Sequence, residues 1–246
     1  MKLHVVATGS RGNAYVLDFG GARLLLDCGI PWREAQKALG FDLRGVEAVF
    51  VTHEHMDHAK GVRGAVDAGL RVVMSDGTRA ALNLRECDVQ VRRHYERFRI
   101  GGFTCVQFPA IHDAAEPCGW LIRCDATGET LLYATDTQYI EVNPAGVHYW
   151  LVECNFQREI MEGNIAVGKL HEGMRIRLLR SHMELETLAA YFDRVSLAKS
   201  RQIVLLHLSD GNSNEDTITR RIGKKSGVPT VCARAGMMLD MRLCPF

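Results

Sequence analysis

The chain has 246 residues, of which 47% are hydrophobic and 24% charged, and its formal net charge at pH 7 is +1. This composition is typical of a globular protein and excludes the fibrous and intrinsically disordered classes. A charge near zero also excludes a global positive field, so binding to nucleic acid would need local basic patches. We expect one domain over residues 1–246, because this length lies within the single-domain range of sheet-rich folds.

The amino-terminal sequence MKLHVVATGS lacks the pattern of an export signal, which is a basic segment followed by a long apolar stretch. No later window reaches the ~18 uncharged apolar residues that a membrane-spanning helix needs. We therefore expect a cytoplasmic protein that does not insert into a membrane.

The eight cysteines are spread along the chain without a Cys-x-x-Cys pair. Most of them lie in apolar runs such as LLLDCGI and FTCVQF. This setting predicts buried free thiols rather than disulfides or a thiolate metal site. The cysteines are Cys28, Cys87, Cys105, Cys118, Cys124, Cys154, Cys232 and Cys244.

Short apolar runs alternate with turn signals in the first hundred residues. The runs LHVVAT, AYVLDF and ARLLLD are separated by GSRGN and GG, which predicts an antiparallel meander. A helix is predicted after Pro31, then a strand at VEAVFVT, a helix through HAKGVRGAVDAG, a strand at LRVVM and a helix at DGTRAALNL. Further strands are predicted near ERFRIGGFTCVQF and at CGWLIRC, TLLYAT and VHYWLVE. The alternation indicates an α/β (α+β) protein.

From residue 157 onward the pattern becomes mainly helical. Ser181 and Glu184 form an S-x-x-E sequence, which predicts a capping box at the start of a long helix through Ala198. A strand at QIVLLH, a helix near EDTITRRIGKK and two short strands complete the chain. With no repeat and no low-complexity tract, two mixed halves that share one core are expected.

A dense group of metal-binding residue types follows the strand VEAVFVT. In the segment THEHMDH, His53 and His55 point to the same side of an extended backbone, so both imidazoles can reach one metal ion. Asp57 and His58 lie where the chain turns into a helix and can reach another ion. A single histidine is more often structural, but three histidines and an aspartate at a strand end favour metal binding.

Later predicted apolar strands also end next to polar residues that could bind a metal ion. His112 follows FTCVQFPAI, Asp136 follows TLLYAT and His207 ends QIVLLH. Each of them alone is compatible with an ordinary turn residue, but together they would complete the coordination of two ions. The nitrogen and oxygen donors suit Zn²⁺, and also Mn²⁺ or Fe.

The order and spacing of these motifs resemble the metallo-β-lactamase superfamily, from LLLDCG through HxHxDH to a later His, an Asp and a last His. The resemblance implies a four-layer αββα sandwich, in which two mixed sheets face each other with helices outside. It implies that Asp27 orients the site and that seven residues hold two divalent metal ions. These are His53, His55 and His112 for one ion, Asp57, His58 and His207 for the other, and Asp136 as the bridge.

Within the superfamily, the chain resembles the YycJ/WalJ-like exonuclease branch through TGSRGNAYVL, IHDAAEPCGW, ATDTQY, the segment from Glu153 to Asn155, SHMELET and HLSDGNSNED. This resemblance implies a DNA exonuclease that acts from the 5′ end. Phe156-Gln157 replaces the usual His-Asp of the branch, and the residues after His182 also differ from it. Neither departure affects a metal ligand. His55 stands where di-iron oxygen-reducing members commonly have Glu, which favours hydrolysis.

Two further features point to phosphate chemistry. The turn that contains Ser10, Arg11 and Asn13 could bind an anion, although a plain hairpin turn explains the same residues. His182 is expected in a first helical turn, where it could bind phosphate and protonate a leaving oxygen. Two divalent ions ~3.5–4 Å apart can acidify a bridging water and clamp a phosphodiester. We assign catalytic roles to Asp57, Asp136 and His182.

The leading hypothesis is a metal-dependent DNA exonuclease with nucleic acid as its partner. Basic groups such as Arg175, Arg177 and Arg180 permit phosphate contacts, although a solvated charged face is the commoner meaning of such a run. Hydrolysis of a small cyclic phosphodiester, or of an ester, thioester, lactone or β-lactam, is the alternative on the same metal pair. A non-catalytic binding protein is a weaker alternative, because every expected ligand is present.

Overall fold

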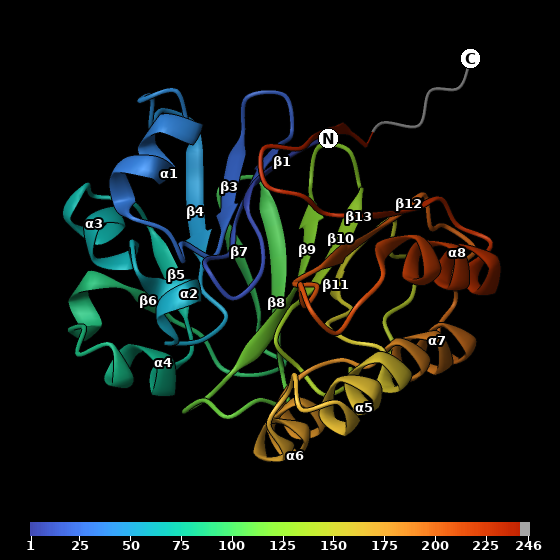
Figure 1. Cartoon of the computed structure of the whole chain (residues 1–246). Helices are drawn as coiled ribbons and strands as arrows, with labels where there is room; N and C mark the ends of the chain where they lie inside the picture. Colours follow the sequence, from blue (N-terminus) through green and yellow to red (C-terminus); the bar gives the residue numbers. More distant parts are fainter. Residues whose placement is uncertain (242–246) are drawn as a thin grey trace. The chain divides into compact units, whose positions relative to one another are not determined.

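The structure is a computed structural model that describes residues 1–241 (Figure 1). Its strands form two mixed sheets of seven strands each, which confirms the predicted α+β class. The chain divides into two compact units. Unit 1 comprises Met1–Pro109, Ala114–Glu129 and the residues from Arg234 on, and unit 2 comprises Ala110–Asp113 and Thr130–Ala233. The expectation of one domain over residues 1–246 stays a prediction.

The whole of the first sheet lies in unit 1, in the order β14-β1-β2-β3-β4-β5-β6. The predicted antiparallel meander is present as β1, β2 and β3, and the neighbours from β3 to β6 are parallel. Parallel strands end at the same edge of a sheet, so the loops after β3 and β4 leave side by side. The strands are β1 Lys2–Ala7, β2 Ala14–Asp18, β3 Arg23–Leu26, β4 Val46–Phe50, β5 Val72–Met74, β6 Gln90–Val91 and β14 Met238–Asp240.

Unit 1 also contains the antiparallel strands β7 Arg97–Ile100, β8 Phe103–Pro109 and β9 Cys118–Cys124. Its helices are α1 Trp32–Ala38, α2 Met56–Ala59, α3 Val62–Asp67, α4 Asp76–Ala81 and the 3-10 helix η1 Glu86–Asp88.

The single helix predicted through HAKGVRGAVDAG is wrong, because the structure has the two short helices α2 and α3 instead. At the break between them, the Gly61 N–H donates to the carbonyl of Cys28 over 2.7 Å. A Cβ at Gly61 would lie 2.5 Å from the Cys28 sulfur, so this close approach requires glycine. The helix is interrupted because its backbone bonds to the segment that follows β3.

Unit 2 is built on four parallel strands, β10 Thr130–Ala134, β11 Tyr149–Glu153, β12 Gln202–Leu206 and β13 Thr230–Cys232. All five residues of β11 are buried, as expected of a near-continuous apolar run inside a parallel sheet. The helices are α5 Arg158–Ala166, α6 Glu172–Ser181, α7 Leu185–Arg194 and α8 Glu215–Ser226. No helix within residues 1–241 is long and apolar enough to cross a membrane.

The seven cysteines within the described range are free thiols, as predicted. Six of them are buried, and Cys87 is exposed. Burial raises the pKa of the Cys28 and Cys105 thiols to about 12, so both stay protonated. Cys244 lies outside the described residues.

The capping box predicted at Ser181 is wrong. Ser181 is the last residue of α6, and α7 begins at Leu185 with Glu184 as its N-cap. One Glu184 oxygen, Oε2, accepts the backbone N–H groups of Glu186 (2.8 Å) and Thr187 (3.1 Å). A carboxylate can reach these two donors as well as a serine hydroxyl can, so the cap lies three residues later than the motif indicates. The helix ends at Arg194 rather than at Ala198.

Replacing Glu184 with alanine removes the cap of α7, so Glu184→Ala is expected to lower the free energy of unfolding by about 0.5–2 kcal/mol. Chemical denaturation measures this loss. Ser181→Ala is the matched control and is expected to cost less, because Ser181 does not cap α7. A larger loss for the Ser181 variant would contradict the cap assignment.

Candidate metal centre

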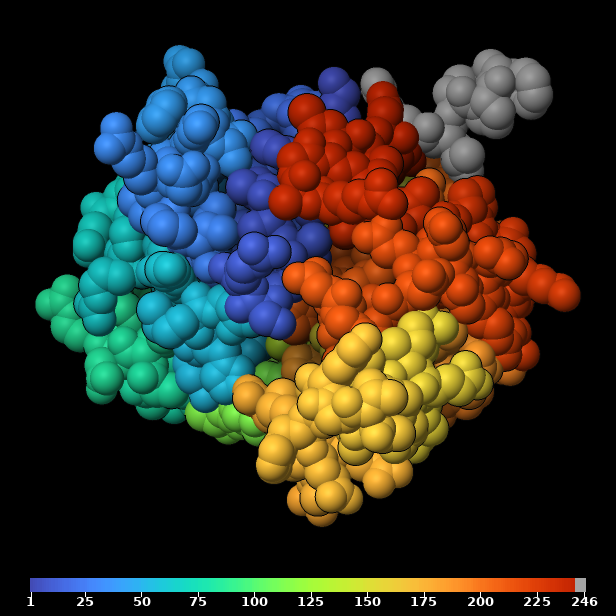
Figure 2. Space-filling model, viewed as in Figure 1, coloured from blue at the N-terminus to red at the C-terminus, as the bar shows by residue number. Residues whose placement is uncertain are grey.

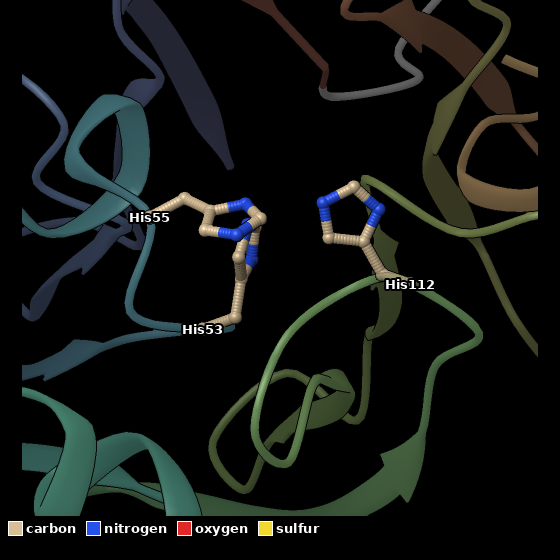
Figure 3. A group of neighbouring side chains, drawn as sticks. All are labelled: His53, His55 and His112. Carbon is tan, nitrogen blue, oxygen red and sulfur yellow. The ribbon is translucent and has the colours of Figure 1, made fainter. Parts of the chain in front are cut away.

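The segment from Thr52 to His58 leaves β4 and brings together three of the predicted metal-binding histidines within unit 1. The rings of His53 and His55 lie 4.7 Å apart at 80°, on one loop (Figure 3). The rings of His53 and His58 lie 4.2 Å apart. Asp57 is also close, with Oδ2 3.8 Å from Nε2 of His58. The loop after β4 and helix α2 therefore bring four predicted ligands into one place.

Asp27 follows β3 and holds this loop through hydrogen bonds, as the predicted orienting residue would. Its carboxylate is fully buried and accepts from Nδ1 of His58 (2.8 Å), the backbone N–H of Thr52 (2.8 Å) and the Thr52 hydroxyl (3.0 Å). The Thr52 oxygen lies 3.0 Å from Nδ1 of His53. Because the Thr52 proton goes to Asp27, the His53 Nδ1–H donates to that oxygen. Both imidazoles then have Nε2 as the unprotonated nitrogen, which is the atom that binds a metal.

Glycine is required at position 29 because the backbone of Asp57 and His58 lies against it. A Cβ on Gly29 would lie 1.6 Å from the carbonyl oxygen of Asp57 and 2.7 Å from the backbone nitrogen of His58. No side-chain atom fits at such distances. Any substitution at Gly29 therefore displaces the backbone that carries Asp57 and His58.

Asn13 has a structural role in this half of the site. It is fully buried, its backbone N–H donates to the carbonyl of Asp57 over 2.7 Å, and its side-chain amide donates toward Nε2 of His58 over 3.0 Å. Its side-chain oxygen accepts from the Gly9 N–H over 3.0 Å. The predicted phosphate-binding turn thus supports the loop through Asn13, whereas Ser10 and Arg11 are exposed.

In unit 2, a single carboxylate organises the predicted residues. Glu153 ends β11 and is fully buried. Its Oε1 accepts from Nδ1 of His182 (2.7 Å) and Nδ1 of His207 (3.0 Å), and its Oε2 accepts from the backbone N–H groups of Thr137 (3.0 Å) and Met183 (3.1 Å). Burial alone would raise the pKa of Glu153, but its contacts with the two histidines lower it overall.

Glu153 also controls the charge of His182. Burial alone would lower the pKa of His182, but the Glu153 carboxylate outweighs this effect and raises the pKa to about 9. The imidazole is therefore protonated at neutral pH. The prediction that His182 lies in a first helical turn is wrong, because it follows α6 in an extended conformation with φ −134° and ψ 154°. A carboxylate, not a helix amino terminus, sets its environment.

His112 and Asp136 lie beside this pair. Nδ1 of His112 donates to the carbonyl of Ser181 over 2.8 Å, which leaves Nε2 for a metal, and Nε2 lies 3.7 Å from Oδ2 of Asp136. Burial lowers the pKa of His112, which favours the neutral imidazole that binds metals. In Figure 3, His112 extends from the loop that follows β8. Four residues of unit 2 offer ligand atoms within 4.8 Å of one another: Asp136, Glu153, His182 and His207.

Three residues that closely follow strands at the site adopt positive φ without being glycine. They are Asp27 (54°), Asp136 (46°) and His207 (52°). A non-glycine residue in a sparsely populated backbone region costs roughly 1–3 kcal/mol and persists only where the surroundings hold it there. The hydrogen bonds of Asp27 and His207 provide such restraint.

The donor set fits divalent metal ions. His53, His58, His112 and His207 each place Nδ1 against an oxygen acceptor, so that Nε2 is the candidate ligand atom, and aspartates accompany them in both units. Imidazole ligands in metal sites usually have such second hydrogen bonds. Glu153 entered the sequence reasoning only through the resemblance. An acidic residue at the end of the apolar run YWLVE was the signal that could have identified it.

The chain is similar to known proteins over most of its length. A family model described as a beta-lactamase superfamily domain matches residues 22–208. The exodeoxyribonuclease WalJ of Streptococcus pneumoniae is 27% identical over 227 residues, covering 86% of this chain and 83% of that protein. The exodeoxyribonuclease YycJ of Bacillus anthracis is 27% identical over 233 residues, covering 87% and 86%. The predicted resemblance to the YycJ/WalJ-like branch is confirmed.

The predicted metallo-β-lactamase fold is confirmed by comparison with a solved structure. The metallo-β-lactamase fold protein YhfI from Bacillus subtilis matches with a TM-score of 0.72 and 18% identity, covering 97% of this chain and 98% of that one.

Asp27→Asn tests whether the buried carboxylate supports metal binding. The amide keeps the size of the side chain but removes the charge that orients His58, so metal affinity is expected to fall about 10–100-fold. Titration calorimetry on metal-depleted protein measures this change. Asp18→Asn is the control, because Asp18 accepts only from the backbone of an exposed turn. Equal affinities for the two variants would contradict the role of Asp27.

Proposed function

Since the chain belongs to the beta-lactamase superfamily, we propose that it is a metal-dependent phosphodiesterase, and specifically a DNA exonuclease. The arrangement that carries the proposal is the shared carboxylate of Glu153, which holds a proposed metal ligand, His207, and a protonated imidazole, His182. Hydrolysis of a phosphodiester needs a proton for an alkoxide leaving group, and His182 is suited to supply it. The similarity to two proteins named exodeoxyribonucleases supports DNA as the substrate.

We assign two divalent metal ions to this protein, with Zn²⁺ or Mn²⁺ as the expected ions and Fe as a third candidate. When bound, the ions would supply an acidified water and neutralise charge on the phosphate. The proposed ligands of one ion are His53, His55 and His112, those of the other are Asp57, His58 and His207, and Asp136 is shared.

His182 acts as the general acid in this proposal. Its Nδ1–H donates to Glu153, and the proton on Nε2 passes to the oxygen of the departing nucleotide. The negative charge of Glu153 keeps the imidazole protonated before the step and orients the ring. Glu153 is therefore a positioning residue, and its contact with Nδ1 of His207 orients that ligand as well.

Asp57 and Asp136 are the other two residues with proposed catalytic roles. Asp57 lies in α2, where its backbone carbonyl accepts from the Asn13 N–H and lies against Gly29. We propose that it orients the attacking water. Asp136 is nearly fully buried beside His112 and His207. We propose that it is a ligand of both metal ions.

Nucleotide release from 5′- and 3′-labelled duplex DNA by Mn²⁺-loaded protein tests the function. We expect release from the 5′ end and its loss on treatment with a chelator. Asp57→Ala, which removes a proposed ligand, is expected to lose this activity and controls for contaminating nuclease. If the wild-type protein hydrolyses small phosphodiesters or esters but leaves DNA intact, the exonuclease proposal is wrong.

His182→Ala separates acid catalysis from metal binding. The variant is expected to keep its metal content, measured by atomic emission, and to lose about 10²–10⁴-fold in turnover of DNA, whose leaving group needs a proton. Turnover of bis(p-nitrophenyl) phosphate is expected to fall much less, because nitrophenolate leaves without protonation. Equal losses on both substrates would exclude the acid role. His4→Ala is the control, because His4 lies on β1 of unit 1 and has no proposed role in the site.

A further inference from the structure

Helix α6 carries a stripe of exposed residues along one side. With 3.6 residues per turn, Ile176, Arg180, Gly173 and Arg177 fall on one continuous arc of the helix surface. On the other side, Leu178 is buried. Ile176 is 57% exposed and the Arg177 side chain 56% exposed. We call Gly173, Ile176, Arg177 and Arg180 the α6 stripe.

Positive charge is concentrated around this stripe. Residues 158–181 contain five basic and three acidic residues, a net charge of +2, whereas the whole chain has only +1. Arg175 lies off the stripe and is engaged by Glu162 over 2.9 Å. Arg180 is exposed and forms no ion pair with any residue between 1 and 241. In Figure 2, the segment 158–181, coloured yellow to light orange, lies at the near surface.

The stripe leads to the proposed catalytic residues of unit 2. Ser181, the last residue of α6, accepts from Nδ1 of His112 through its carbonyl, and His182 follows directly. Nε of Arg177 lies 3.7 Å from Oδ2 of Asp113, the residue after His112. The rings of His112 and His182 lie 5.3 Å apart. A polymer whose reacting bond lies at His182 would therefore have α6 beside its next units.

We propose that the α6 stripe binds the sugar-phosphate backbone of the DNA strand next to the bond being cleaved. Arg177 and Arg180 contact phosphates, and Ile176 packs against a sugar or base. This inference rests on the proposed nuclease function and names the surface that would hold its substrate.

The chemistry of the stripe suits this occupant. Residues three apart on a helix are neighbours, so Arg177 and Arg180 can engage adjacent parts of one strand. The guanidinium group binds phosphate oxygens in a bidentate manner, and Gly173 leaves that part of the arc without a side chain. Phosphate contacts position a strand without reading its sequence, as an exonuclease that degrades any sequence requires. Ile176 is the one apolar side chain of the α6 stripe, and its small apolar area favours a nucleic acid over a lipid bilayer.

Arg180→Ala tests the proposal, with Arg220→Ala as the matched control. Arg220 is also an exposed arginine on a helix of unit 2, α8, so both variants lose the same charge. The metal-loaded proteins are assayed on labelled single-stranded DNA and on bis(p-nitrophenyl) phosphate. We expect kcat/KM on DNA to fall about 5- to 20-fold more than on the small substrate for Arg180→Ala, mainly through KM. The plot of log kcat/KM against log salt concentration should become less steep by about 0.7.

The outcomes separate this inference from the function on which it rests. If wild-type protein degrades DNA and the Arg180 and Arg220 variants behave alike, the stripe proposal is wrong and the nuclease proposal stands. If wild-type protein does not degrade DNA, the nuclease proposal is wrong. Binding of phosphorothioate-linked single-stranded DNA, followed by fluorescence anisotropy, then tests the stripe proposal by itself. Equal affinity of wild type and Arg180→Ala for this DNA overturns the stripe proposal. Preferential binding to phosphatidylglycerol vesicles would also overturn it.

Discussion

The carboxylate of Glu153 is the interaction on which the candidate site of unit 2 depends. A buried carboxylate is costly unless hydrogen bonds compensate for the lost water, and here two imidazole N–H groups and two backbone N–H groups surround it. Because these donors come from residues after β10, α6 and β12, one buried charge aligns three loops. The same contact orients His207 as a proposed ligand and keeps His182 protonated, so the site's geometry and its charge have one origin.

In unit 1, Asp27 is the buried carboxylate that hydrogen bonds compensate. This carboxylate also follows a buried strand of a sheet and also accepts from an imidazole Nδ1 and a backbone N–H, here those of His58 and Thr52. In both units a buried acid at a strand end holds a proposed metal ligand through Nδ1 of its imidazole. The strain at Asp27 and His207, both with positive φ, is the cost of placing these groups where strands end.

Local sequence signals were reliable where a single energetic preference decided the structure. The meander and the apolar β11 were predicted because alternation and continuous apolar runs have few other stable solutions. The free buried cysteines were predicted because they lie in apolar runs without a Cys-x-x-Cys pair. The errors arose where two local solutions were nearly equal. Either Ser181 or Glu184 could cap a helix, and the contact between Gly61 and the carbonyl of Cys28, far away in sequence, decided whether α2 and α3 form one helix or two.

The sequence by itself determined the family, the two-sheet class and the identity of the candidate metal-binding residues, because these depend on residue types at fixed spacing along strands and their ends. Tertiary structure alone decided what each side chain contacts. Glu153 bonds to residues 29 and 54 positions later in the chain, and Asn13 reaches a loop 44 positions away. Such contacts follow from strand order and loop path, which no local pattern records. For this reason the role of Glu153, the environment of His182 and the exposed arc of α6 became visible only in the folded chain.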